Sequence, residues 1–224
     1  FVQRRVMKMD KVGNEITTKE HFLNVLESRK SIRIYDENVK ISKEEMTELL
    51  AAAIKAPSSV NLQPWRFVVI ESDEAKSTLA PLASFNQNQV KTSSAVIAVF
   101  ADMNNLDYLE EIYGKAVELG LMPEEVKENQ VPAIRGLLSS ISDQQNKETI
   151  LIDGGLVSMQ LMLTAKAFGY DTNPIGGFDK ENIAEAFGLE KERYVPVMLI
   201  SIGKANEAGY KSYRMPVEQV TEWK

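Results

Sequence analysis

The sequence of 224 residues contains no cysteine and a single histidine, His21. Without cysteine the chain has no disulfide, no thiolate nucleophile and no Cys-based zinc site. A single histidine rules out His-rich metal sites and almost every Ser-His-Asp arrangement. We therefore predict no metal site, and we expect that any enzymatic chemistry is carried by a bound cofactor.

Long apolar runs and glycine-rich nucleotide motifs are also missing. No apolar run approaches the length of a membrane span, and no hydrophobic signal region is present. The patterns GxGxxG, GxxxxGK[ST] and GxSxG do not occur, so a Rossmann or P-loop site has no support. Lys and Arg number 26 and Asp and Glu 32, a net charge of −6, which argues against nucleic acid or an anionic membrane as the main partner. We expect a cytoplasmic protein.

The composition is that of an ordinary soluble globular protein, with 44% hydrophobic and 26% charged residues. The length favours a single domain, which we place at residues 15–224 after a lead-in at 1–14. Residues 104–140 are helical in character and are expected to form an excursion or a lid over the core. The tail from residue 204 carries several aromatic side chains, which suggests that it docks on a partner subunit.

Apolar periodicity, capping residues and glycine or proline breaks predict the regular elements. Helices are expected at about 17–28, 42–54, 73–82, 147–168 and 179–188, and strands at 66–70, 95–100 and 195–203. Residues 171–178 read as a loop. The helix at 147–168 is apolar on nearly all sides, which predicts burial on more than one side. Gly154-Gly155 in its middle predicts close approach of another backbone or a planar ligand.

The segment 56–65, APSSVNLQPW, joins a predicted helix to a predicted strand. Pro57 and a second proline restrict the backbone and remove donors, so the stretch between them is expected to be a rigid turn. Ser58, Ser59, Asn61 and Gln63 place hydroxyls and amides on that turn. Preset donors and acceptors on a stiff loop favour a ligand site; the alternative is that these residues are only turn formers.

The segment 29–35 places three cations and a hydroxyl close together. Ser31 and Arg33 alternate with isoleucines, so in an extended backbone they share a face, and an Arg fork beside a hydroxyl suits a phosphate. The alternative is that Arg29 and Lys30 only complement the dipole at the end of the preceding helix.

Two further polar segments are candidates. Asn86 and Gln89 belong to a run of four amides, which is either solvated helix surface or a set of hydrogen-bonding groups for a ring edge. In the late segment 174–177, Pro174 and Ile175 offer a flat apolar wall, and the two glycines allow a backbone N–H to approach a ligand closely. The alternative for that segment is a plain loop before the next helix.

These segments together resemble the nitroreductase family of FMN-dependent oxidoreductases. The matching stretches are RKSIR at 29–33, APSSVNLQPW at 56–65, PIGG at 174–177 and RMP at 214–216. They span nearly the whole chain in the order the family has, and the stretch around 57–65 is the most specific of them.

The resemblance implies an α+β fold, a nitroreductase-like sandwich with a mostly antiparallel central sheet flanked by helices, built as an intertwined homodimer. It implies two FMN molecules at the subunit interface, NADH or NADPH as electron donor, and a ping-pong cycle that ends on a small-molecule acceptor. FMN carries the chemistry in this family, so the resemblance implies no catalytic side chain.

The family's binding roles carry over onto particular positions of this chain. Arg29, Ser31 and Arg214 would hold the phosphate and ribityl chain, with Lys204 or Lys211 as an open choice beside Arg214. Arg33 would lie near the pyrimidine edge, Asn86 at the flavin edge, and the backbone N–H of Gly176 near N5. Pro57, Ser58, Ser59 and Asn61 would come from the other subunit. The full predicted set is Arg29, Lys30, Ser31, Arg33, Pro57, Ser58, Ser59, Asn61, Gln63, Asn86, Gln89, Pro174, Ile175, Gly176, Gly177, Lys211 and Arg214.

Two positions depart from the pattern of some members. Gln89 stands where some members have a lysine near the flavin edge, and Gly176 stands where some have an acidic residue. The expected activity is reduction of nitro or quinone-like acceptors. The alternatives are a specialised flavin enzyme of the same family, such as a dehalogenase or ring reductase, and a flavin-binding protein without turnover.

Overall fold

Four strands form one sheet in the computed structural model, which describes residues 17–224. They are β1 (Trp65–Ile70), β2 (Ala95–Asp102), β3 (Asp171–Ile175) and β4 (Tyr194–Gly203), in the order β1-β2-β4-β3. Each neighbouring pair is antiparallel. The expected α+β class with an antiparallel sheet is confirmed. The predicted lead-in at residues 1–14 lies outside the described residues, and the single domain at 15–224 stays a prediction.

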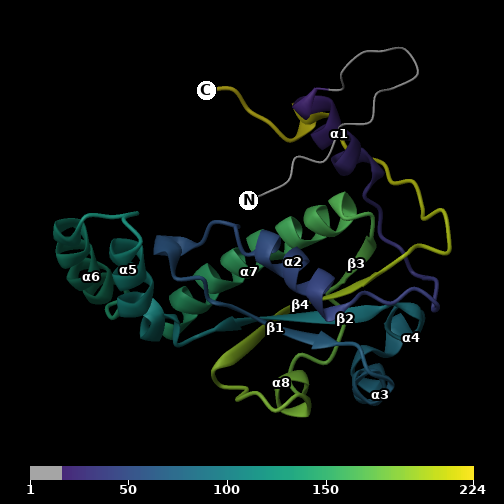
Figure 1. The fold of residues 1–224 in the computed structure, drawn as a ribbon, viewed down its shortest axis with the longest axis horizontal. Coiled ribbons are helices and arrows are strands. Elements are labelled where there is room, and N and C mark those ends of the chain that lie inside the picture. Colours follow the sequence, from purple (N-terminus) through teal and green to yellow (C-terminus); the bar gives the residue numbers. More distant parts are fainter. Residues whose placement is uncertain (1–16) are drawn as a thin grey trace.

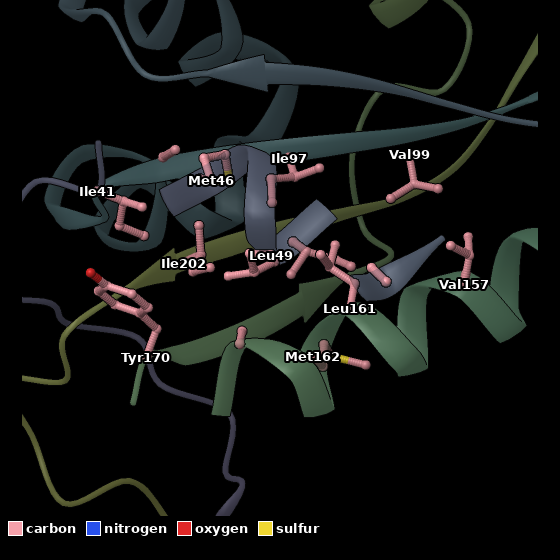
Figure 2. Close-up of a cluster of buried hydrophobic side chains, with 14 of the residues drawn as sticks. Ile41, Met46, Leu49, Ile97, Val99, Val157, Leu161, Met162, Tyr170 and Ile202 are labelled. Atoms are coloured by element: carbon pink, nitrogen blue, oxygen red, sulfur yellow. The ribbon is translucent and has the colours of Figure 1, made fainter. Parts of the chain in front are cut away.

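Helices cover both faces of the sheet (Figure 1). On one side lie α2 (Lys43–Ala53) and α7 (Asp143–Ala167), and on the other α3 (Asp73–Leu79), α4 (Gln87–Thr92) and α8 (Ile183–Ala186). The buried strand β2 contributes side chains to the cores on both faces of the sheet, because successive side chains of a strand point to opposite faces. Ile97 and Val99 join the core beneath α2 and α7, where Figure 2 shows them facing Leu49 and Leu161. Phe100 joins the core on the other side.

Capping residues set the ends of the helices. Thr17 and Glu20 form a capping box at the start of α1 (Thr18–Ser28). Ser142 and Gln145 form a second capping box, which starts α7 four residues before the predicted position 147. Gly169 follows α7 with φ +83°, the left-handed conformation in which glycine commonly ends a helix.

Three predicted elements differ in the structure. The helix expected at 73–82 ends at Leu79 and continues as a 3-10 segment, Ala80–Asn86, with a kink at residue 83. The helix expected at 179–188 is reduced to the four residues of α8. The expected loop at 171–178 begins with the strand β3. Turn-forming residues pointed to a loop there, but β3 lies at the edge of the sheet, where Pro174 is tolerated without a backbone N–H.

A close approach explains one of the two glycines inside α7. The pairing of β2 with β4 shifts between Val99 and Phe100, which leaves Val197 as an extra residue on β4. A Cβ added to Gly154 would lie 2.7 Å from a methyl carbon of Val197. The predicted close neighbour at Gly154 is therefore a side chain of the same chain. A Cβ on Gly155 would have nothing within 4 Å among the described residues.

The excursion and the tail extend away from the sheet (Figure 1). Residues 104–140 contain a 3-10 turn, Asn105–Tyr108, and the helices α5 (Leu109–Glu118) and α6 (Glu124–Leu138). These lie at one end of the molecule, and their role as an excursion over the core stays a prediction. The C-terminal tail, with a 3-10 turn at Val217–Gln219, runs back beside α1 at the top of the view.

The prediction that no segment approaches a membrane span is wrong for α7, which is long and apolar enough by length and composition. Its apolar residues have another explanation in the fold. Val157, Leu161 and Met162 are buried against the sheet in the core beneath α2. We therefore interpret α7 as a core helix of the kind that passes the same length test.

A buried carboxylate ties together the ends of β1, β2 and β4. Asp102 has no exposed surface and accepts hydrogen bonds from Nε and Nη2 of Arg193, each at 2.9 Å. The guanidinium of Arg66 lies 3.4 Å from the same carboxylate. The hydrogen bonds to Asp102 raise the pKa of Arg193 above its ordinary value. The charge of Asp102 is therefore compensated inside the fold.

Candidate ligand-binding site

Four basic side chains converge where the end of α1 meets the C-terminal tail. Arg29 directly follows α1 and is succeeded by Lys30, while Lys211 and Arg214 lie on the tail. They surround a cavity of about 450 Å³. Its lining consists of Leu26, Glu27, Arg29, Lys30, Tyr210, Lys211, Ser212 and Arg214. Cations from two distant parts of the sequence therefore share one site.

Hydrogen bonds within the chain position these cations. Nη1 of Arg214 donates to Oγ of Ser212 at 2.7 Å, and Nζ of Lys30 donates to the carbonyl oxygen of Ala208 at 3.1 Å. Further N–H groups of both side chains remain for a ligand. Such a cluster suits a phosphate group, which accepts charge-assisted hydrogen bonds from several donors at once.

The sequence left open whether Lys204 or Lys211 joins Arg214, and the structure distinguishes the two. Lys211 lines the cavity beside Arg214. Lys204 is engaged elsewhere: its Nζ donates to the carbonyl oxygen of Gly169 and lies 4.5 Å from the centre of the Tyr170 ring. Of the two candidates, Lys211 joins the cation cluster.

Ser31 connects the cation cluster to the edge strand of the sheet. It forms a parallel bridge with Thr172 of β3, and the next N–H, that of Ile32, donates to the Thr172 carbonyl oxygen at 3.1 Å. Arg33 is exposed and stacks over the ring of Tyr210 at 5.0 Å from its centre. Segment 29–33 thus runs from the cluster to the start of β3.

Gly176 and Gly177, here called the glycine turn, directly follow the other end of β3. Nδ2 of Asn86 donates to the carbonyl oxygen of Gly177 at 3.3 Å, and Nε2 of the buried Gln89 donates to Oδ1 of Asn86 at 3.0 Å. A Cβ on Gly176 or Gly177 would meet nothing within 4 Å among residues 17–224, so the space over this turn is open. Asn86 and Gln89 thus lie at this turn, whereas Gln87 and Asn88 are exposed. A role of Asn86 and Gln89 at a ring edge stays a prediction.

The apolar wall expected from Pro174 and Ile175 is corrected by the structure. The two residues are neighbours on β3, so their side chains point to opposite faces of the sheet. Ile175 is only 3% exposed and packs in the core with Ile183 and Leu199. Pro174 alone of the pair is half-buried and available as a wall.

Spacing along β3 defines the length of the ligand that would fit. Gly176 at the turn is four positions after Thr172, which lies beside the cations. At about 3.3 Å per residue the two ends lie roughly 13 Å apart along the strand. The hydroxyl of Thr172 is buried and has no hydrogen-bond partner among the described residues. An elongated molecule with an anionic group over the cations would reach this turn along β3.

The loop at 57–63 has a strained backbone. It contains a 3-10 turn, Ser59–Asn61, at the place where the sequence predicted a turn, and the rigidity of that turn stays a prediction. Val60, Asn61 and Gln63 have positive φ values of 40°, 56° and 49°, although none of them is glycine. Oγ of Ser58 accepts a hydrogen bond from the backbone N–H of Gln63 at 3.0 Å, while Ser59, Val60 and Asn61 are exposed.

Within residues 17–224, the lining of the cation cavity includes no residue of the 57–63 loop. The loop instead rests on α7, where its Ser59 N–H donates to Oδ1 of Asp153 at 3.0 Å. Asp153 is 4% exposed, and burial raises its pKa while the bond from Ser59 opposes that rise. The structure therefore brings the predicted residues together in two groups, one along β3 and one on this loop.

Sequence reasoning missed several residues of both groups. Tyr210 and Ser212 line the cation cavity, and an aromatic tail was the only signal for them. Asp153 supports the 57–63 loop, and its signal was an acidic residue among apolar neighbours in the middle of α7. Thr172 went unnoticed because its segment was read as a loop.

The sequence also matches known proteins. A sequence model described as the Nitroreductase family matches residues 26–204. A relative from Bacillus subtilis (strain 168), provisionally named NAD(P)H nitroreductase YdgI, is 70% identical over 203 residues, which is 91% of this chain and 97% of the relative. The CLA biosynthesis enone reductase of Lactiplantibacillus plantarum is 34% identical over 201 residues, which is 89% of this chain and 93% of that enzyme.

The fold is similar to solved structures as well. The crystal structure of a provisionally named nitroreductase from Exiguobacterium sibiricum 255-15, in complex with FMN, matches with a TM-score of 0.89 at 64% sequence identity. The match covers 91% of this chain and 97% of that chain.

Proposed function

This chain belongs to the nitroreductase family, and from that premise we propose that it oxidises NADH or NADPH with bound FMN and reduces nitro or quinone-like acceptors. The structural match confirms the expected nitroreductase-like fold. Family membership and the FMN-bound relative also support an FMN-dependent NAD(P)H oxidoreductase in general. The acceptor class and the ping-pong order are the specific part of the proposal.

The cation cluster between α1 and the tail is the observation that carries the proposal. Arg29, Lys30, Lys211 and Arg214 surround one cavity, a donor set that fits the phosphate of FMN. Ser31 lies beside the cluster and would contact the ribityl chain. These residues would bind and orient the cofactor.

The opposite end of β3 fits the ring of FMN. When bound, FMN would accept a hydride from NAD(P)H and supply electrons to the acceptor. Asn86 and Gln89 would hold the ring edge, with Pro174 against one face and the N–H of Gly176 directed at the ring. The guanidinium of Arg33 would stabilise negative charge at the pyrimidine edge. No side-chain base is needed for these roles.

We further propose that the site is completed by a second copy of the chain. The 57–63 loop lies apart from the cation cavity and presents Ser59 and Asn61 to solvent. The face of α7 turned away from the sheet exposes Ile152, Leu156 and Met159. A homodimer through this face and the tail would bury these apolar side chains and bring Pro57, Ser58, Ser59, Asn61 and Gln63 to the partner's FMN.

Sedimentation tests the dimer. The wild-type protein should sediment as a dimer, and Ile152→Glu should produce monomers, because it places a charge in the apolar face. Leu119→Glu is the matched control, since Leu119 is also exposed but lies at the end of α5. A folded FMN-bound monomer of the wild type would overturn the dimer.

An absorbance experiment tests the activity. The purified protein should show flavin bands between about 300 and 550 nm, and anaerobic NADH or NADPH should bleach them. A nitroaromatic compound or a quinone should then restore the bands. In steady-state kinetics, double-reciprocal plots of rate against NAD(P)H at several acceptor concentrations should give the parallel lines of a ping-pong reaction. Bands that NAD(P)H leaves unchanged would favour a flavin-binding protein without turnover, and the absence of flavin binding would refute the assignment.

A second candidate is reduction of an activated carbon–carbon double bond. The observation that favours it is the 34% identity to an enone reductase over 89% of this chain. An acceptor panel containing a quinone, a nitroaromatic compound and an unsaturated ketone separates the two. A kcat/KM highest for the unsaturated ketone would select the second candidate.

We also propose a cytoplasmic location, with neither nucleic acid nor membrane as partner. The net charge of −6 supports weak attraction to polyanions. Fractionation of cells that produce the protein would test the location.

A further inference from the structure

The left-handed backbone of the 57–63 loop requires support from its surroundings. Val60 is β-branched, and for such a residue a φ of 40° is an outlier. Its neighbour Asn61 and the nearby Gln63 have positive φ values as well. Residues held in sparsely populated regions persist only where the surrounding structure fixes them, and they concentrate at functional sites.

Three side chains from different elements hold the backbone of this loop. Oδ1 of Asp153 on α7 accepts the N–H of Ser59 at 3.0 Å. The hydroxyl of Tyr113 on α5 donates to the carbonyl oxygen of Val60 at 3.2 Å. Each bond engages a backbone group, so each fixes the path of the loop while leaving the side chains of Ser59 and Val60 free.

The third contact comes from the start of β1. Nη1 of Arg66 donates to the carbonyl oxygen of Gln63 at 3.2 Å. Arg66 itself is held by Asp102, whose carboxylate lies 3.4 Å away, and by the ring of Tyr108, whose centre lies 4.3 Å away. The far end of the loop is thus anchored to the buried charge cluster of the sheet.

The excursion helices hold the loop through packing as well. Leu62 is 1% exposed and belongs to a cluster separate from the two cores of the sheet. The other buried members of this cluster are Leu109, Tyr113, Val131 and Ile134, all from α5 and α6. The loop therefore inserts its one buried side chain between the two excursion helices.

We propose that α5 and α6, together with Asp153 of α7, act as a brace for the 57–63 loop, and that Tyr113 and Asp153 are positioning residues for FMN binding. The brace keeps the loop in the left-handed conformation that presents Ser59 and Asn61. The inference rests on the proposed function, in which this loop contacts FMN. It assigns a role to residues 104–140, for which the sequence alone indicated none.

The brace acts through the population of the binding-competent loop. When only a fraction of molecules hold the competent conformation, the apparent dissociation constant rises in inverse proportion to that fraction. Removing one hydrogen bond to the loop backbone should weaken FMN binding by about two- to tenfold. Side chains that merely stabilise the fold would lower the melting temperature without this change.

The test is titration of FMN into the apoprotein, followed by fluorescence, for a small set of variants. Tyr113→Phe removes the hydroxyl and keeps the ring in its cluster, and Asp153→Ala removes the acceptor for the Ser59 N–H. Asp153→Asn retains an oxygen acceptor at that position and should restore most of the affinity. Tyr170→Phe is the matched control, because its hydroxyl bonds Glu45 at 2.7 Å, away from the loop.

Hydrogen exchange of the apoprotein supplies a second measurement that is independent of FMN. The peptide that covers residues 58–63 should exchange faster in Tyr113→Phe and in Asp153→Ala, whereas peptides from β2 should be unchanged. A merely structural role would instead raise exchange throughout the sheet or nowhere.

The outcomes separate the brace from the proposed function. FMN binding by the wild type that is weakened by Arg29→Ala but unaffected by Tyr113→Phe and Asp153→Ala would overturn the brace alone. A wild-type protein that binds no FMN would overturn the proposed function, and faster exchange at 58–63 would still report the brace. Equal weakening by Tyr170→Phe would also overturn the assignment of Tyr113 as a positioning residue.

Discussion

Replacing Arg29 with alanine tests the assignment of the cation cavity as a phosphate site. A hydrogen bond to a charged group contributes about 1.5–3 kcal/mol, which corresponds to about 10- to 150-fold in affinity. Arg29 shares the cavity with Lys30, Lys211 and Arg214, which retain part of the attraction. We therefore expect Arg29→Ala to weaken FMN binding by about tenfold, at the lower end of that range.

The assay compares FMN with riboflavin, which differs only by the missing phosphate. If Arg29 contacts the phosphate, the variant should lose affinity for FMN and keep its affinity for riboflavin. Added salt should weaken FMN binding more than riboflavin binding, because screening reduces the attraction between exposed charges. Arg135→Ala, on the exposed face of α6, is the control and should change neither affinity.

Two results would refute this reasoning. Equal weakening of FMN and riboflavin would mean that Arg29 supports the fold of the site without contacting the phosphate. Unchanged affinity for both would place the phosphate outside the cavity between α1 and the tail.

Three further predictions concern stability. Arg193→Met should lower the free energy of unfolding by about 3 kcal/mol, because it removes the main partner of the buried Asp102. Gly154→Ala should lower it by about 1–3 kcal/mol, since the new Cβ would lie 2.7 Å from a methyl carbon of β4. Asp153→Asn should increase stability more at pH 7 than at pH 4. Burial raises the pKa of Asp153 in the folded protein above its ordinary value of 3.8. The stability that comes from this shift is present below pH 3.8, and it is lost as the pH rises through the raised pKa and the buried carboxyl becomes charged.

Urea unfolding measures all three, with matched controls. Arg135→Met breaks an exposed ion pair with Glu110 and should change stability by less than about 1 kcal/mol. Gly136→Ala lies inside α6, where a Cβ meets nothing within 4 Å in the described part of the chain, and should stabilise by up to about 1 kcal/mol. An Arg193→Met loss as small as that of Arg135→Met would contradict the first prediction. A Gly154→Ala gain would contradict the second, and an Asp153→Asn effect independent of pH would contradict the third.

Much of the fold was accessible from local patterns. The strand at 95–100 is a continuous apolar run and proved buried on both faces, and capping residues placed the starts of α1 and α2. The segment 171–178 was misread because proline, asparagine and glycine favour turns. Only its position at the sheet edge makes β3 a strand, and that position depends on pairing with β4, far along the chain.

The sequence by itself determined the chemistry that this protein has available. The lack of cysteine and the single histidine directed the expectation toward a cofactor, and the motifs at 29–33, 56–65, 174–177 and 214–216 indicated the family. Tertiary structure decided which of these residues lie together. It placed Arg29 and Arg214 around one cavity, buried Ile175 and kept the 57–63 loop out of the lining of that cavity. The physical reason is that motifs and local periodicity depend only on residues that are close in sequence. A binding site depends on contacts between residues that are distant in sequence, and those contacts form only in the folded chain.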